Sequence, residues 1–338
     1  MKEKGELDKY LKRVEKQLAA VLPEQVDTVW LEAAAGQSCG ETEPRQADCF
    51  LEPGRALLRR GGKRWRPLVT VLTCEALGGG ERADALVPLT EIPHNGSLIV
   101  DDIEDSSAVR RGGKAVHLEF GEDLAINMGN LMYFLPTLVW ERADFPPEIC
   151  LEMTHDWMAA MRRLHLGQGY DIFWHRESEL FPEPAAYLRM CRFKTGSLAS
   201  LAARLGARAA LGAAGADVSG QRSVQSVAGS ASMIGERGGI TAAAERAKSG
   251  AGMRGETSSG IAEDFSGMSE DYAAGRFPVS DRLVKQLGDV WEDIGTGFQI
   301  LDDVQNLTTG IPGKDRGDDI VEGKKSLPVI LHVQKHPE

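Results

Sequence analysis

Apolar residues recur at spacings of three and four along most of the chain, which is the repeat of a helix with one buried face. Leu7, Val14, Leu18 and Val21 set this pattern and predict a helix over residues 2–21. Similar patterns predict helices over residues 44–60, 64–78, 82–108, 122–143, 147–174, 184–211, 280–307 and 322–334. No run alternates apolar and polar residues for long enough to require a sheet. We therefore expect an all-α protein, a single-domain bundle of long helices around a central cavity.

One long stretch departs from this pattern. It has no Phe, Tyr or Trp from Lys194 to Asp264, and twelve glycines lie from Gly206 to Gly260. Sequence rich in Gly, Ala and Ser buries too little apolar area to offset the entropy of ordering it. Residues 212–278 are accordingly predicted to be a flexible insertion, for which a mobile surface loop is favoured over a functional lid.

Composition narrows the classes of partner. The chain has 39 Lys and Arg against 50 Asp and Glu, a net charge of −11, which argues against general binding to nucleic acid. The five cysteines are scattered and show no CxxC spacing, so neither a disulfide framework nor a zinc site is expected. A charged N-terminus and a longest apolar run of only residues 131–140 predict no signal peptide and no stable membrane insertion. A cytoplasmic protein fits these features.

Two acidic clusters about two hundred residues apart carry the most specific signal. The first aspartate cluster, residues 101–105, contains Asp101, Asp102 and Asp105. The second aspartate cluster, residues 299–306, contains Gln299, Asp302, Asp303 and Asn306. Like charges on one helical face repel and, unless solvated, need a counter-cation. Oxygen ligands without Cys or paired His favour Mg²⁺ or Mn²⁺, so the clusters are interpreted as two walls of a magnesium-diphosphate site.

Basic segments near these clusters suit a phosphate ligand. The turn at residues 61–67 places Lys63, Arg64 and Arg66 at a predicted helix start, where backbone amides and the helix dipole favour an anion. A solvated basic surface is the alternative for this turn. Arg110 and Arg111 follow the first aspartate cluster.

Several further polar residues permit two interpretations. His94, two helical turns before Asp101, is either a core histidine or a ligand contact. Gln168 and Asp171, and likewise Lys194 and Thr195 at an apparent helix break, are either structural or part of the site. The charged segment after the second cluster is either an exposed loop or part of the site, and it contains Lys314, Asp318, Asp319, Lys324 and Lys325.

The order of these motifs resembles the trans-type isoprenyl diphosphate synthases, the polyprenyl synthetase family, over residues 44–211 and 280–334. The motifs that carry the resemblance are the Gly-Gly-Lys-x-x-Arg-Pro turn at 61–67, the first aspartate cluster and Phe-Gln-x-x-Asp-Asp at 298–303. The resemblance implies a prenyltransferase that condenses isopentenyl diphosphate with an allylic diphosphate by Mg²⁺-dependent ionisation. It also implies two or three Mg²⁺ ions, with Mn²⁺ as a possible substitute, and a homodimer.

The resemblance also assigns roles to residues. It makes Asp101, Asp102, Asp105, Asp302 and Asp303 the metal ligands, and these together with Lys194 the catalytic residues. It places Lys63, Arg66, His94 and Arg111 on the homoallylic diphosphate. It places Arg110, Lys194 and Lys314 on the allylic diphosphate, with Thr195, Gln168, Asp171, Gln299, Asp319 and Lys324 in support.

In this family, bulky residues four and five positions before the first aspartate stop chain growth early. Here Gly96 and Ser97 occupy those positions, which predicts an open floor and a product of C20 or longer, with Met132, Tyr133 or Phe134 as deeper stops.

Two other functions remain open at this stage. They are a class I terpene cyclase, which needs no second diphosphate site, and a non-catalytic regulatory subunit of a heteromeric prenyl synthase. The family usually continues beyond the position that corresponds to Glu338, so an incomplete C-terminus is expected, which keeps the second alternative open.

Overall fold

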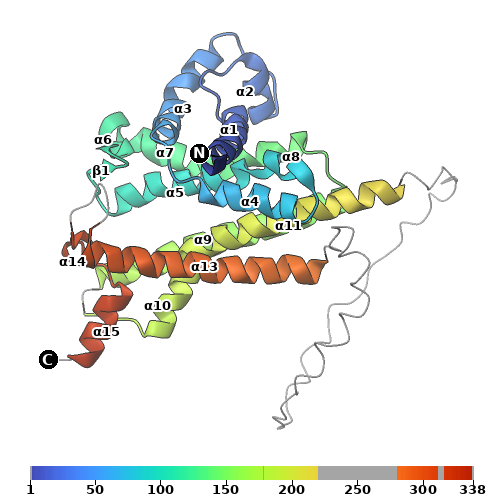
Figure 1. The fold of residues 1–338 in the computed structure, drawn as a ribbon. Coiled ribbons are helices and arrows are strands. Elements are labelled where there is room, and N and C mark those ends of the chain that lie inside the picture. The colour runs from blue at the N-terminus through green and yellow to red at the C-terminus, as the bar shows by residue number, and fades with distance from the viewer. Residues whose placement is uncertain (1, 178, 220–279, 311–315, 337–338) are drawn as a thin grey trace, which may run out of the picture. The chain divides into compact units, whose positions relative to one another are not determined.

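The computed structural model of the chain describes residues 2–177, 179–219, 280–310 and 316–336. Its elements, shown in Figure 1, are α1 (Lys2–Val21), α2 (Thr28–Ala35), α3 (Glu43–Arg59), α4 (Trp65–Ala76), η1 (Gly80–Leu86), α5 (Pro88–Glu104), β1 (Val109–Arg110), β2 (Gly113–Lys114), α6 (Val116–Phe120), α7 (Glu122–Phe134), η2 (Leu135–Leu138), α8 (Val139–Arg142), α9 (Pro147–Arg176), α10 (Pro184–Cys191), η3 (Arg192–Gly196), α11 (Ser197–Ser219), α13 (Asp281–Thr308), α14 (Asp318–Val321) and α15 (Leu327–Lys335). Within the described residues, β structure is limited to the antiparallel hairpin of β1 and β2. The predicted all-α class is confirmed.

Several predicted helices are divided in the structure, for reasons of local chemistry. The segment 82–108 is a 3-10 turn, η1, followed by α5, which ends at Glu104 because the chain turns sharply at Ser106 with a positive φ of 52°. The segment 122–143 breaks near Pro136, since proline lacks the amide that continues a helix. The helix predicted over 322–334 begins only at Leu327, and the short helices α2 and α6 were not predicted.

The boundary of the predicted insertion differs from the structure at its start. Helix α11 continues to Ser219, so residues 212–219 are helical. The remainder of the predicted insertion, residues 220–278, lies outside the described residues.

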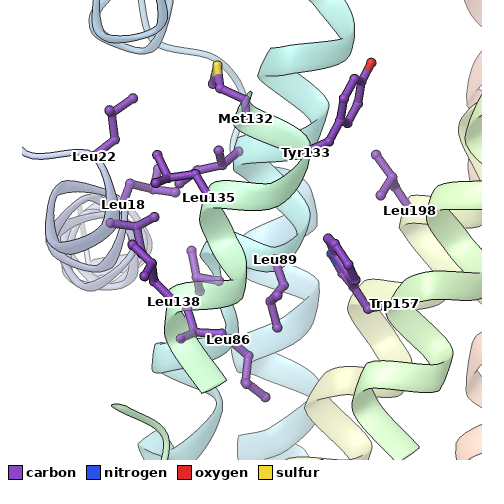
Figure 2. Close-up of a cluster of buried hydrophobic side chains, with 14 of the residues drawn as sticks. Leu18, Leu22, Leu86, Leu89, Met132, Tyr133, Leu135, Leu138, Trp157 and Leu198 are labelled. Carbon is purple, nitrogen blue, oxygen red and sulfur yellow. The ribbon is translucent and has the colours of Figure 1, made fainter. Parts of the chain in front are cut away.

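The main core surrounds α5. Leu89, Ile92 and Ile99 of this helix are fully buried, and Figure 2 shows the surrounding cluster of leucines from α1, η1 and η2 with Trp157 of α9. Gly96 lets α7 approach closely, because a Cβ at this position would lie 2.7 Å from Cβ of Met132. This packing fixes α5 and therefore the direction in which its C-terminal aspartates project.

A smaller core lies below the second aspartate cluster. Trp174 of α9, Tyr187 of α10 and Ile330 of α15 are buried together, and Ile300 of α13 packs against them. Figure 1 shows α10 and α15 beneath one end of α13. The helix that carries the second cluster is therefore held by three other helices.

Candidate active site

A cavity of about 660 Å³ opens between α4, α5, α9, η3, α13 and the segment 319–326. Both aspartate clusters contribute to it, through Asp101 of α5 and through Asp302 and Asp303 of α13. Fourteen predicted site residues line this cavity: Lys63, Arg66, His94, Asp101, Arg110, Gln168, Asp171, Lys194, Thr195, Gln299, Asp302, Asp303, Asp319 and Lys324. Residues far apart in sequence thus meet in one space, as the motif pattern predicts.

Three predicted residues do not line the cavity, and Lys314 lies outside the described residues. Asp102 is fully buried, and Arg110 donates from Nε to its Oδ1 at 2.7 Å. Asp105 lies just after the end of α5 and pairs with Lys324. Arg111 donates to the carbonyl oxygen of Gly61 and to Oδ1 of Asn95, so it supports the basic turn from behind. Helical spacing placed Asp102 and Asp105 near Asp101, but the sequence did not predict the partners of these residues or of Arg111.

Asp101 is the centre of the first cluster. Its oxygens accept from Gln168 Nε2 at 3.0 Å, Arg110 Nη2 at 3.3 Å and Lys194 Nζ at 3.4 Å. Burial alone would raise the pKa of Asp101, but the charges of Lys194 and Arg110 outweigh it and hold this pKa at about 2. The carboxylate is therefore ionised throughout the neutral range.

Lys194 reaches Asp101 because of an irregular helix. Residues 192–196 form a π-helical segment, η3, a feature that often occurs at functional sites. Gly167 of α9 permits its close approach, since a Cβ there would lie 2.4 Å from the backbone nitrogen of Lys194. Lys194 Nζ donates to Asp171 Oδ2 at 2.6 Å, and these carboxylates raise the pKa of Lys194 despite its burial.

A third cation closes the cavity from the C-terminal side. Lys324 Nζ lies 2.9 Å from Oδ2 of Asp105, and this contact joins the end of α5 to the segment after α14. We refer to Arg110, Lys194 and Lys324 as the paired cations, because each contacts a carboxylate of the first aspartate cluster.

The basic turn supplies cations of a different kind. Arg66 is only 8% exposed, and its guanidinium stacks over the ring of Trp65. Among the residues that the structure describes, its Nε has no hydrogen-bond partner. Burial lowers the pKa of Arg66 to about 10, which leaves it charged at neutral pH. Neither Arg66 nor the exposed Lys63 forms an ion pair within the described residues. We call these two the unpaired cations.

His94 lies beside the unpaired cations in the cavity. Burial, together with the charges of Arg66 and Arg111, lowers the pKa of His94 well below its usual value. The imidazole is therefore neutral at pH 7 and offers one N–H donor to a ligand. The third cation of the turn, Arg64, is instead structural, because it is buried in ion pairs with Glu15 and Glu91.

The second aspartate cluster combines one exposed and one fixed carboxylate. Asp302 is exposed and has no partner among the described residues. Asp303 is 6% exposed and accepts hydrogen bonds from the hydroxyl of Tyr187 and from Gln299 Nε2. Thr195 Oγ1 donates to Gln299 at 2.8 Å and orients that amide. Burial raises the pKa of Asp303, and the hydrogen bonds from Tyr187 and Gln299 oppose this effect.

The apolar end of the cavity includes Ser97, Tyr133, Leu164 and Leu198. Gly96 does not contribute open space there, contrary to the prediction, because it faces α7 at contact distance.

The three residues predicted to stop chain growth deeper in the cavity lie in different environments. Tyr133 lines the cavity, Met132 is fully buried in the core, and Phe134 is 67% exposed. Figure 2 shows Met132 and Tyr133 extending to different sides of the chain. Of these candidates, Tyr133 is the one that can meet a ligand in the cavity.

Sequence reasoning missed other lining residues. Glu104 accepts from Gln168 and lies one turn from Asp101, so its helical spacing could have identified it. Trp65 and Phe298, whose rings lie 5.3 Å apart, come together from α4 and α13. No local sequence pattern predicts such a contact, because it depends on how helices distant in the sequence pack.

The donor set is compatible with Mg²⁺. Within the described residues, no group of three or more His, Cys, Asp or Glu side chains is arranged around one metal position. Mg²⁺ commonly uses one or two protein carboxylates and completes its shell with water and substrate phosphates. Asp101 and Asp302 provide such hard oxygen donors in one cavity.

The sequence matches the model of the polyprenyl synthetase family over residues 47–227 and 271–338. This match covers more than half of the chain, which therefore belongs to the polyprenyl synthetase family. Both aspartate clusters and the basic turn fall inside the matched ranges.

Among relatives, the chain is 35% identical over 290 residues to the geranylfarnesyl diphosphate synthase of Aeropyrum pernix, covering 82% of this chain and 69% of that protein. It is 37% identical over 166 residues to a geranylgeranyl pyrophosphate synthase of Eremothecium gossypii, covering 47% of this chain and 51% of that protein. The chain spans about half the length of the latter and of a similar synthase from Epichloe festucae.

Solved structures agree on the fold. The geranylgeranyl pyrophosphate synthetase of Pyrococcus horikoshii matches with a TM-score of 0.67 and 23% identity, over 99% of this chain and 77% of that one. The corresponding protein of Geoglobus acetivorans matches with a TM-score of 0.64 and 24% identity, over 98% of this chain and 77% of that one. At these identities the likeness shows the shared all-α architecture. No helix in the described part of the chain is long and apolar enough to span a membrane.

Proposed function

We propose that this protein is a prenyltransferase that condenses isopentenyl diphosphate with an allylic diphosphate, and that its product is C20 or longer. One observation carries the proposal: carboxylates from α5 and α13 share a cavity with both the paired and the unpaired cations. The names of relatives in the family, geranylgeranyl and geranylfarnesyl diphosphate synthase, support this substrate class and product range.

The half of the cavity with the paired cations suits the allylic diphosphate. Asp101 and Asp302 would hold two or three Mg²⁺ ions, with Mn²⁺ as a substitute, and bound Mg²⁺ would neutralise the diphosphate oxygens as a Lewis acid. The paired cations would then exchange their carboxylate partners for phosphate oxygens. Fixed positive charge at the point where the leaving group becomes negative is an effective form of catalysis. Asp102 and Asp105 would act through Arg110 and Lys324, which they contact.

The half with the unpaired cations suits the homoallylic diphosphate. Arg66 is a buried guanidinium without an acid partner in the described parts of the chain, and a bidentate phosphate contact would satisfy it. Lys63 and the neutral His94 would add further donors. The diphosphate would be anchored there, so that its alkene is held toward the apolar part of the cavity near Ser97 and Tyr133.

A terpene cyclase is less well supported, because such an enzyme has no use for a second, uncompensated phosphate site. A regulatory subunit is less well supported because the aspartates and cations are all present. A homodimer in the cytoplasm remains our expectation for the assembled protein, and light scattering after size exclusion would test its stoichiometry.

The proposed function is tested by incubating the protein with radiolabelled isopentenyl diphosphate, Mg²⁺ and allylic primers of several lengths. We expect incorporation into C20 or longer prenyl diphosphates, and loss of incorporation when EDTA is added. Conversion of a primer to a cyclic hydrocarbon without uptake of label would support the cyclase. No reaction with any primer would contradict the proposal.

A further inference from the structure

We propose that Tyr187 is a positioning residue for the second aspartate cluster. In this proposal, its hydroxyl holds the carboxylate of Asp303 in the orientation that the metal-diphosphate complex requires. The inference rests on the proposed function and adds a residue that neither the motif pattern nor the family match assigns.

Tyr187 itself has little freedom to move. Its side chain is 1% exposed and is packed among Trp174, Met190 and Ile330 in the smaller core. A tyrosine ring that is held by packing delivers its hydroxyl to one place in space. That hydroxyl donates to Oδ2 of Asp303 and so connects α10 to α13.

The other carboxylate oxygen of Asp303 also accepts a hydrogen bond. Oδ1 of Asp303 accepts from Gln299 Nε2 at 3.1 Å, and the oxygen of Gln299 accepts from Thr195 at 2.8 Å. Asp303 is therefore fixed by neutral donors on both oxygens. The backbone N–H of Leu327 also donates to this carboxylate, so three of its four lone-pair sites are used and one is left for a cation.

The neighbouring Asp302 differs from Asp303 in its exposure and in its partners. It is exposed and has no partner within the described residues, although it directly precedes Asp303 on α13. One exposed carboxylate beside one fixed carboxylate permits a cation to be captured by the first and located by the second. Residues that orient metal-site carboxylates commonly affect metal affinity or activity by about 10- to 100-fold.

The alternative is a purely structural role, in which Tyr187 only satisfies a buried carboxylate. The two roles differ in what the loss of the hydroxyl changes. A structural role lowers thermal stability and leaves the affinity for Mg²⁺ and inorganic diphosphate unchanged. A positioning role lowers that affinity in the folded protein.

The test compares the unsubstituted chain with Tyr187→Phe and Tyr170→Phe. Tyr170 is a matched control, because it stacks on Trp174 of the same core while its side chain is 45% exposed. Calorimetric titration of inorganic diphosphate in the presence of Mg²⁺ measures affinity, and thermal unfolding measures stability. We expect about 10- to 100-fold weaker binding for Tyr187→Phe and no change for Tyr170→Phe.

A second comparison covers the case in which Tyr187→Phe does not fold. Asp303→Leu combined with Tyr187→Phe replaces both partners of the buried contact by apolar side chains, which is better tolerated than removing one. In the Asp303→Leu background, loss of the hydroxyl should cause no further loss of affinity. A further tenfold loss there, or unchanged affinity in folded Tyr187→Phe, would overturn the inference. Absence of binding by the unsubstituted chain would overturn the proposed function together with it.

Discussion

The two halves of the cavity differ in how their positive charges are compensated. Lys194 lies 2.6 Å from a carboxylate oxygen of Asp171, and Lys324 lies 2.9 Å from one of Asp105. Arg66, by contrast, is buried without an ion-pair partner in the described chain, and the neighbouring His94 is kept neutral by a lowered pKa. The paired cations are neutralised by carboxylates of the chain, whereas Arg66 and His94 leave positive charge and a neutral donor for an anion.

Under the proposed function, this difference predicts two kinds of diphosphate binding. A diphosphate would enter beside the unpaired cations without displacing any carboxylate. Beside the paired cations, it would compete with the first aspartate cluster unless a divalent ion binds those carboxylates. Mg²⁺ should therefore be needed for the binding of one diphosphate and not of the other.

The largest effect is expected at Asp101. Asp101→Asn should lower turnover by about 1000-fold, since a single oriented group that stabilises developing charge is worth 10²–10³ in rate. Stability should also fall, because the charge whose pairing with Lys194 and Arg110 lowers the pKa of Asp101 is lost, so turnover is compared in protein shown to be folded. The control is Asp144→Asn, an exposed aspartate after α8. Steady-state turnover of a matched primer measures the effect, and near-normal turnover would refute the assignment of Asp101.

The next effect concerns linkage between metal and ligand. Addition of Mg²⁺ should tighten the binding of a non-ionising allylic thiolodiphosphate by about 100-fold, within the usual range of coupling between ligands. It should change the binding of isopentenyl diphosphate by less than about twofold on the same scale. Equilibrium dialysis with and without EDTA provides both values. If Mg²⁺ changed the binding affinities of the two ligands equally, the predicted difference between the paired and the unpaired cations would be wrong.

Two arginines of the basic turn, Arg64 and Arg66, sharpen the comparison. Arg66→Gln should raise the KM for isopentenyl diphosphate by about 30-fold, since a charge-assisted hydrogen bond is worth about 2 kcal/mol. It should leave the KM for the primer and the thermal stability almost unchanged.

The matched substitution Arg64→Gln should behave differently. Arg64 lies 2.9 Å from Glu91 in a buried ion pair, so its loss should cost about 3 kcal/mol of stability. Initial-rate kinetics and denaturant unfolding separate the two substitutions. If Arg64→Gln rather than Arg66→Gln raised that KM in a stable protein, the assignment of the unpaired cations would be wrong.

The smallest effect concerns product length. Ser97→Phe should shorten the product and Tyr133→Ala should lengthen it, each by at least one isoprene unit, because both side chains line the apolar end of the cavity. Phe134→Ala is the control, since Phe134 is 67% exposed. Chromatography of the dephosphorylated products measures the shift. An unchanged product for both Ser97→Phe and Tyr133→Ala would place the floor elsewhere.

The sequence was sufficient for the fold class and for most of the charged residues that line the cavity. Helical periodicity located the helices, and the acidic and basic motifs marked the residues that the fold brings together. The approach failed where a helix end or a neighbouring helix decides the outcome. Asp105 follows the end of α5 and pairs with Lys324, although regular spacing placed it on one face with Asp101.

Other differences have the same physical origin. Basic composition alone does not separate Arg64 from Arg66, whereas the Gly-Gly-Lys-x-x-Arg-Pro motif selects Arg66. In the structure, Arg64 has a left-handed backbone and forms ion pairs with Glu15 and Glu91. Gly96 was interpreted as open space, whereas it is occupied by the close approach of α7. The sequence indicated a helix break at Lys194, where the structure has a π-helical turn that a local pattern does not specify. Each of these features depends on contacts between segments distant in the chain.

The most direct measurement is a crystal structure with Mn²⁺ and inorganic diphosphate, in which anomalous scattering locates the metal ions. The account predicts manganese between Asp101 of α5 and Asp302 of α13, with diphosphate oxygens in contact with Lys194. Manganese on only one aspartate cluster, or diphosphate bound without any metal beside Asp101, would contradict it.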